Sequence, residues 1–160
     1  MLRISRLTDY ATVILATLAQ DPARVQTAAC LADQTRLALP TVSKLLKQLQ
    51  RAGLVTSTRG LRGGYQLARP ATDISASDIL DALEGPFAIT DCASGQGNCG
   101  IEKSCRVGHA WQRLNVTIRR SLREVSLAQL AGIDNSQPQV LALEREMKAA
   151  AAARAHPRST

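Results

Sequence analysis

Three cysteines lie close together in a stretch that contains glycine, DCASGQGNCGIEKSC, just before a long helical pattern. They are Cys92, Cys99 and Cys105. Thiolates are soft ligands for zinc and iron–sulfur clusters, and glycines allow a loop to wrap around a metal. Clustered thiols without such a use would be an oxidation liability. The stretch therefore predicts a metal site, either an iron–sulfur cluster or zinc.

The composition favours an intracellular helical protein. The 160 residues fit one domain with an extension, and 45% of them are hydrophobic while only 2% are aromatic. The fourth cysteine, Cys30, lies in a helical context and is expected to be a small buried apolar residue. The apolar run ATVILATLA follows Arg3 and Arg6, as in a signal peptide, but it has helical spacing and is too short to span a bilayer. We therefore expect a cytoplasmic protein with reduced thiols and no membrane partner.

Three short helices are predicted in the first third of the chain. The first begins at an N-cap near Thr8 and ends at Asp21-Pro22, and the second opens with Thr27. The third, PTVSKLLKQLQRA, has proline in its first turn and stops at Gly53. The apolar faces are Leu7, Ala11, Ile14, Leu15 and Leu18 in the first helix, and Val42, Leu45, Leu46 and Leu49 in the third.

A β-hairpin is predicted directly after the third helix. Residues 54–58 and 65–68 have strand character, and the glycine loop RGLRGG with two arginines lies between them. Two short helices, a tight connection and a third helix with a polar outer face form a helix-turn-helix pattern. Because the hairpin follows the recognition helix, the fold class is mainly α, a winged helix-turn-helix.

The charge pattern of this region predicts binding to DNA. Residues 36–69 contain seven basic side chains and neither aspartate nor glutamate, in a chain of formal net charge +7. A merely solvated face normally mixes both signs. Phosphate or minor-groove contact is expected from Arg59 and Arg62. The polar face of the third helix carries Thr41, Ser43, Lys44, Lys47, Gln48 and Arg51.

The rest of the chain contains two further helices. Ser75 and Asp78 form a capping box, with Ile74 and Ile79 as a hydrophobic staple, and Gly85-Pro86 ends that helix. A long helix is predicted from about residue 107 to 130, ended by Gly132. Its apolar residues form a narrow seam that favours dimerisation: Val107, Trp111, Leu114, Ile118 and Val125.

The predicted organisation has four parts. Residues 1–86 form the DNA-binding domain, 87–106 the cysteine-rich loop, 107–132 the dimerisation helix, and 133–160 a partly disordered tail.

The segments SRLTDYA, RGLRGGYQLARP and the cysteine loop before a Trp-containing helix together resemble the Rrf-type winged-helix transcription regulators. The opening MLRISRLTDYATVIL and NCGIEKSCRV are most similar to the branch that regulates SUF iron–sulfur assembly operons. The resemblance covers residues 1 to about 132. It implies a homodimer with one cluster per subunit, 2Fe–2S or 4Fe–4S, whose occupancy changes DNA binding. It also implies that Cys92, Cys99 and Cys105 are ligands, that Thr41, Ser43 and Lys44 enter the major groove, and that Arg59 enters the minor groove.

The fourth cluster ligand departs from the family pattern. The first two cysteines are separated by six residues, whereas the IscR-like pattern has five. The IscR-like histidine, three residues after the last cysteine, is replaced by Gly108, and His109 follows. NsrR-like members instead use an aspartate of the first helix that reaches across the dimer, and Asp9 matches it. Asp9 could equally be a helix-capping acid, and His109 a surface residue.

These observations lead to several functional hypotheses. The first is a cluster-sensing regulator that represses a SUF-type operon, bound to double-stranded operator DNA. The second is a nitric-oxide-sensing repressor with a 4Fe–4S cluster, and the third is a winged-helix protein with a structural zinc. A redox enzyme or cluster carrier is disfavoured, because no nucleotide-binding glycine motif, nucleophile–base pair or substrate-pocket signature is found. No small-molecule substrate is therefore expected.

Overall fold

Three helices near the N-terminus supply most of the buried core. In this computed structural model, residues 4–60, 62–86, 88–90 and 107–136 are described. The helices are α1 (Arg6–Gln20), α2 (Ala28–Thr35) and α3 (Leu39–Arg51). The apolar positions predicted for α3, and those of α1 from Ala11 onward, are at most 1% exposed. The spacing of three and four residues therefore identified the faces that pack together.

The start of α1 differs from the prediction. Ser5, and not Thr8, is the N-cap, and its side chain accepts a hydrogen bond from the backbone N–H of Thr8. The helix therefore begins earlier, and Thr8 lies inside it, 2% exposed. Leu7, predicted to face the core, is 41% exposed, whereas its neighbour Thr8 is the buried residue of this turn.

The other predicted helix ends of this region are confirmed. Thr27 caps α2, which ends at Arg36 in the left-handed conformation (φ 56°). Pro40 lies in the first turn of α3, and Gly53, with φ 71°, follows its C-cap. Glycine adopts this conformation without steric cost, which is why the helix stops there.

The predicted hairpin is present and is attached to the body at a second point. Strands β1 (Val55–Thr58) and β2 (Gly64–Leu67) pair antiparallel, with Val55 opposite Leu67. Tyr65 also exchanges two backbone hydrogen bonds with Gln26, of 2.9 and 2.7 Å. Gln26, in the segment before α2, therefore forms an isolated antiparallel bridge to β2.

The predicted capping box of the next helix is also confirmed. After a short 3-10 helix, η1 (Ala71–Asp73), Ser75 and Asp78 cap α4 (Ala76–Glu84) reciprocally. The two residues of the predicted staple, Ile74 and Ile79, are buried in the core. Gly85, with φ 83°, ends the helix.

The prediction of one continuous helix over residues 107–130 is wrong. Helix α5 (Gly108–Glu124) ends before Val125, which is extended, and Ser126 caps a separate short helix α6 (Leu127–Leu130). Residues 125–127 instead bond to residues 74–76, with Ala76 N–H to Val125 O at 2.8 Å and Leu127 N–H to Ile74 O at 2.7 Å. The break buries Leu127 completely, and Gly132 follows α6 rather than α5.

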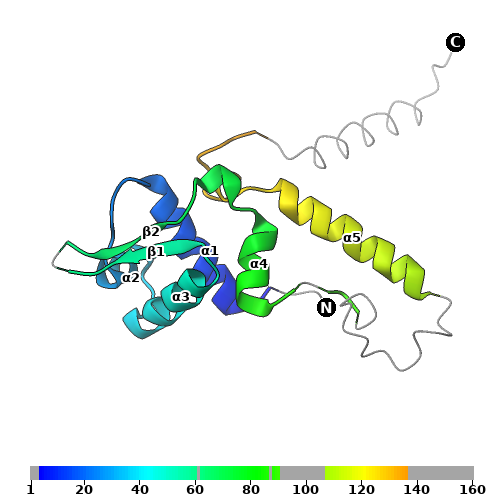
Figure 1. The fold of residues 1–160 in the computed structure, drawn as a ribbon, viewed down its shortest axis with the longest axis horizontal. Coiled ribbons are helices and arrows are strands. Elements are labelled where there is room, and N and C mark those ends of the chain that lie inside the picture. The colour runs from blue at the N-terminus through cyan, green and yellow to red at the C-terminus, as the bar shows by residue number, and fades with distance from the viewer. Residues whose placement is uncertain (1–3, 61, 87, 91–106, 137–160) are drawn as a thin grey trace, which may run out of the picture.

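Helix α5 extends from the body on the side away from the hairpin (Figure 1). None of the described helices is long and apolar enough to cross a membrane. Most of the cysteine-rich segment and of the tail lies outside the described residues, so the four-part division of the chain stays a prediction.

Candidate nucleic-acid interface

The outer face of α3 forms a shallow basic depression. It has a volume of about 300 Å³ and is lined by Pro40, Ser43, Lys44, Lys47, Gln48 and Arg51. The spacing of three and four residues places these side chains on one side of the helix. The opposite side carries the buried leucines, so the core fixes the direction in which the basic side points.

Five cations of the acid-free region are available to a polyanion. Lys44, Lys47 and Arg51 on α3, and Arg59 and Arg62 in the hairpin loop, are exposed. None of the five makes an ion pair or a side-chain hydrogen bond within the described residues. Uncompensated cations raise the local positive potential, which attracts phosphate.

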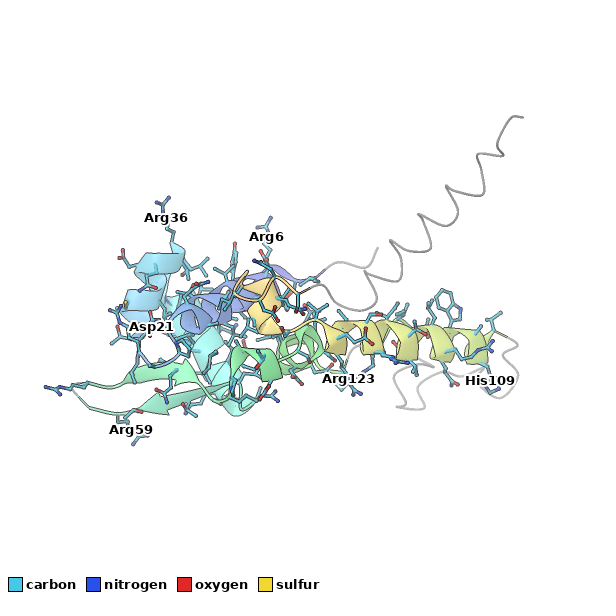
Figure 2. The ribbon with its side chains drawn as sticks, turned by 90° about the horizontal axis from the view of Figure 1, so that it is seen from above. Arg6, Asp21, Arg36, Arg59, His109 and Arg123 are labelled. Carbon is cyan, nitrogen blue, oxygen red and sulfur yellow. The ribbon has the colours of Figure 1, made fainter. Side chains whose placement is uncertain are left out.

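The other two basic side chains of the region do not belong to this set. Arg69 donates to Asp78 at 3.0 Å, so its charge is compensated. Arg36 and Arg59 lie on opposite sides of the molecule in Figure 2. Counting charge along the sequence therefore overestimated the basic surface, because a count does not show side-chain direction.

The hairpin is held beside α3 by polar contacts. The side-chain amide of Gln50 on α3 donates to the hydroxyl of Ser57 on β1, at 2.8 Å. At the tip, the N–H of Gly63 donates to the carbonyl of Gly60 at 2.9 Å, and Gly60 has a φ of 114°. The first contact fixes β1 beside α3, and the second shapes the turn between Arg59 and Arg62.

Two residues of α3 behave differently from the cations. Thr41, a predicted DNA contact, is half-buried and does not line the depression. Gln48 lines it, and its side-chain oxygen is buried without a hydrogen-bond partner among the described residues. A buried acceptor without a partner is costly, which makes Gln48 a candidate for contact with a ligand. Its place on the polar face was the only sequence signal for this.

The candidate metal ligands are only partly described. Cys92, Cys99 and Cys105 lie outside the described residues. Within the described part, no three His, Cys, Asp or Glu side chains gather in a way that could hold a metal. His109 lies at the free end of α5, far from Arg6 at the start of α1 (Figure 2). Asp9 is in the first turn of α1, so one subunit does not bring Asp9 and His109 together.

The segment just before the cysteines is anchored to α5. The backbone N–H of Ile89 donates to the side-chain oxygen of Asn115 at 3.3 Å, and Asn115 is only 6% exposed. One turn further along, Arg119 donates to Asp81 of α4 at 2.8 Å. The residues that lead into the cysteine segment are therefore fixed relative to α5, which we call the arm.

The end of α4 is also attached to the start of α1. A single carboxylate oxygen of Glu84 accepts from the hydroxyl of Thr8 at 2.6 Å and from the backbone N–H of Ser5 at 3.0 Å. These two hydrogen bonds, Thr8 first, lower the pKa of Glu84 below its ordinary value of 4.5. The contact joins the N-terminus of α1, where Asp9 lies, to the helix that precedes the cysteines.

Cys30 differs from its prediction as a buried apolar residue. It is half-buried on α2, and its sulfur accepts a hydrogen bond from the side-chain amide of Gln34 at 3.0 Å.

Comparison with known proteins identifies the family. Residues 4–132 match the Rrf2 family, described as iron-dependent transcriptional regulators. The chain belongs to the Rrf2 family. The resemblance seen in the sequence and the winged-helix fold class are thereby confirmed.

Curated relatives are named as regulators. A candidate HTH-type transcriptional regulator of Neisseria meningitidis serogroup A is 37% identical over 97 residues, which cover 61% of this chain and 65% of that protein. The match thus spans slightly less than two thirds of that relative. A candidate HTH-type transcriptional regulator of Haemophilus influenzae is 32% identical over 109 residues, covering 68% of this chain and 72% of the relative.

Two solved regulator structures share the fold. CymR, the global cysteine regulator of B. subtilis, superposes with a TM-score of 0.65 at 28% identity, covering 84% of this chain and 100% of that one. IscR of T. potens superposes with a TM-score of 0.61 at 28% identity, covering 85% and 91%.

Proposed function

We propose that this Rrf2-family chain binds a double-stranded DNA operator through α3 and the β1–β2 hairpin. The observation that carries the proposal is a set of five exposed cations that have no partner within the part of the chain that the structure describes: Lys44, Lys47, Arg51, Arg59 and Arg62. In this proposal α3 enters the major groove, with Thr41, Ser43 and Lys44 near its start. The hairpin arginines contact phosphate or the minor groove.

We infer that Cys92, Cys99 and Cys105 hold an iron–sulfur cluster, 2Fe–2S or 4Fe–4S, as the sensor. Three soft thiolates fit such a group, because clusters are bound mainly by cysteine. The description of the family as iron-dependent and the likeness to T. potens IscR support this choice. Asp9 or His109 would complete the site. In this proposal, cluster supply or oxidative conditions control repression of an iron–sulfur assembly operon of the SUF type.

A homodimer through α5 completes the proposal. Trp111 and Leu114 of α5 are 40% and 44% exposed in the single chain, although both are large and apolar. Two winged helices joined in this way would read two half-sites of one operator, because a two-fold protein matches a two-fold site.

Two alternatives share the same winged helix. A nitric-oxide-sensing repressor would carry a 4Fe–4S cluster, and a structural zinc would only hold the loop. The absorption spectrum of protein purified without oxygen separates these classes of site. Charge-transfer bands support a cluster, and their loss on exposure to nitric oxide supports the first alternative. Colourless protein with bound zinc would contradict the cluster proposal.

The DNA proposal is tested by the salt dependence of binding. The operator is first identified by selecting DNA duplexes that bind the full-length protein, with and without its metal. The affinity of the protein for these duplexes is then measured at a series of salt concentrations. Replacing Lys47 by Ala should weaken all duplexes similarly and reduce the slope of log affinity against log salt by about one, if Lys47 contacts a phosphate.

The control for this experiment is Arg123→Ala, which removes an exposed cation of α5. It should leave the slope unchanged. An unchanged slope in Lys47→Ala would remove Lys47 from the phosphate contacts, and salt-insensitive wild-type binding would contradict the proposed interface.

A further inference from the structure

Helix α5 carries an apolar stripe whose outer part is exposed among the described residues. Val107, Trp111 and Leu114 are 58%, 40% and 44% exposed, and half-buried Ile118 and Leu122 continue the stripe toward the body at spacings of three and four. The side of α5 that contacts α4 is a neighbouring one, marked by buried Asn115 and by the Arg119–Asp81 pair. Among the described residues, the outer part of the stripe, from Val107 to Leu114, is therefore left uncovered.

The stripe leads into an apolar groove at the base of the arm. The groove has a volume of about 410 Å³, and its walls include Ile4 before α1, Ile79 on α4, Leu122 on α5 and Leu130 on α6. Its polar lining comes from α1 and includes Asp9 and Thr12. The carboxylate of Asp9 has no hydrogen-bond or ion-pair partner among the described residues.

Two-fold symmetry brings the tip of one arm to the base of another. In an isologous contact, residue i touches residue j and residue j touches residue i. If two α5 helices cross antiparallel at Ile118, Trp111 of one copy lies opposite residue 125, because both are seven positions from the axis. Leu114 then lies opposite Leu122, each four positions away. Val125 and Leu122 both line the groove.

Charge and hydrogen bonding also favour a second copy as the occupant. The chain has a formal net charge of +7, and Arg113, Arg120 and Arg123 lie roughly opposite the stripe on the helix. Two copies can therefore approach through the stripe without opposing cations. A buried indole N–H needs an acceptor, and that of Trp111 has none among the described residues, whereas the groove offers Asp9.

We propose that the groove of one subunit receives Trp111 from the arm of a second copy. This inference rests on the dimer in the proposed function and adds where the arm tip docks. The indole packs between Ile4, Ile79 and Leu130, and its N–H donates to Asp9. Each dimer contains two such contacts, one at each end of the paired arms.

The sequence contains a single tryptophan, so its fluorescence reports this contact directly. Dimers are formed from two full-length chains in the same metal state. One chain is wild type, and the other carries Trp111→Phe, which removes its signal, together with Leu130→Gln, which adds a polar group to its groove. The control partner carries Trp111→Phe with Val13→Gln, because Val13 is an exposed α1 residue, 42% exposed, outside the groove.

The proposal expects the emission of wild-type Trp111 to shift to longer wavelength with the Leu130→Gln partner and to stay unchanged with the control partner. A shift only when Leu130→Gln is in the same chain as Trp111 would place the contact within one subunit and overturn the proposal. No shift in either arrangement would exclude the groove.

Dissociation of the dimer gives a second measurement. Trp111→Ala should raise the dimer dissociation constant by about thirtyfold or more, because buried aromatic anchors are interface hot spots. Val116→Ala, at a site 66% exposed on another side of α5, should leave it unchanged. Equal effects of both variants would overturn the proposal. A chain that passes these tests but binds no duplex would contradict the proposed function alone.

Discussion

Among single residues, Gly64 shows a direct steric requirement. A Cβ atom at this position would lie 2.5 Å from the carbonyl oxygen of Gln26, and that oxygen accepts the 2.7 Å hydrogen bond from the N–H of Tyr65. A side chain at residue 64 must therefore separate the hairpin from the segment before α2. The base of the β1–β2 hairpin, the wing of the winged helix, therefore requires glycine at residue 64.

Gly64→Val is expected to lower the free energy of unfolding by about 1–3 kcal/mol, as overpacking typically does. It should also weaken operator binding by displacing Arg59 and Arg62, while the dimer remains intact. Chemical denaturation, duplex binding and sedimentation measure the three effects. Thr58→Val, an exposed change of similar size opposite Gly64 on β1, is the control and should change none of them. Operator affinity equal to wild type in Gly64→Val would contradict the wing assignment.

Among elements, the end of α5 shows what a periodic pattern cannot predict. Val125 continues the apolar seam at the expected spacing, so the pattern alone predicted one helix through residue 130. The break is set by the distant backbone of residues 74–76, to which residues 125–127 bond. A local signal was present, because Ser126 and Gln129 form a capping box. Helix boundaries of this kind require both the cap and the partner segment to be recognised.

The contact between α4 and α1 has a defined pH dependence. Because hydrogen bonds from Thr8 and Ser5 lower the pKa of Glu84 in the folded state, ionised Glu84 stabilises the fold at neutral pH. This contribution is complete above the ordinary pKa of 4.5 and is lost as the pH falls through the lowered folded value. Glu84→Gln should therefore reduce stability at pH 7, by less than about 1 kcal/mol since the group is largely exposed, and reduce the acid sensitivity.

Thermal unfolding measured from pH 7 down to pH 3 tests this contact. The control is Asp33→Asn, which removes an exposed carboxylate of α2. A pH profile of Glu84→Gln that runs parallel to wild type through the acid range would show that the contact does not contribute.

The anchor between α5 and the cysteine segment predicts a local effect. Asn115→Ala removes the acceptor of the Ile89 N–H, so hydrogen exchange at Ile89 should become faster. We expect a loss of about 1–2 kcal/mol in stability, and a lower cluster content after anaerobic reconstitution. Thr117→Ala is the matched control, because that exposed hydroxyl donates only to the carbonyl of Arg113 within α5. Equal exchange rates at Ile89 in Asn115→Ala and wild type would exclude the anchor.

For the molecule as a whole, local patterns predicted more than long-range contacts. The apolar faces of α1 and α3, the hairpin and the cap at Ser75 were predictable because each depends on neighbouring residues. The contact between Thr8 and Glu84 joins residues far apart in the sequence, and no short motif indicates it. Arg69 was counted as a free cation because its partner Asp78 lies beyond the acid-free region. Contacts between subunits are even harder to predict, because a pattern within one chain does not show which residues of a second copy it meets.

The fourth cluster ligand depends on the whole dimer. Three thiolates leave one coordination position to be filled. In one chain Arg6 at the start of α1 lies far from His109 at the free end of α5 (Figure 2), and the family resemblance implies that an aspartate at the position of Asp9 reaches across the dimer. His109, at the start of α5, is local to Cys105 in sequence. We favour Asp9, because its position matches a ligand position of the family; one carboxylate oxygen would bind iron and the other would accept from the Trp111 indole. Loss of the cluster would then release a link between the two DNA-binding domains.

Comparing Asp9→Ala with His109→Ala after anaerobic reconstitution tests this preference. Asp9→Ala should lose cluster, change its absorption spectrum and alter operator affinity, whereas His109→Ala should keep all three. Full retention of the cluster in Asp9→Ala with loss in His109→Ala would reverse the assignment, and retention in both would give the position to another group. If Asp9→Ala shifts Trp111 emission but keeps the cluster, Asp9 acts in docking the arm and does not bind iron.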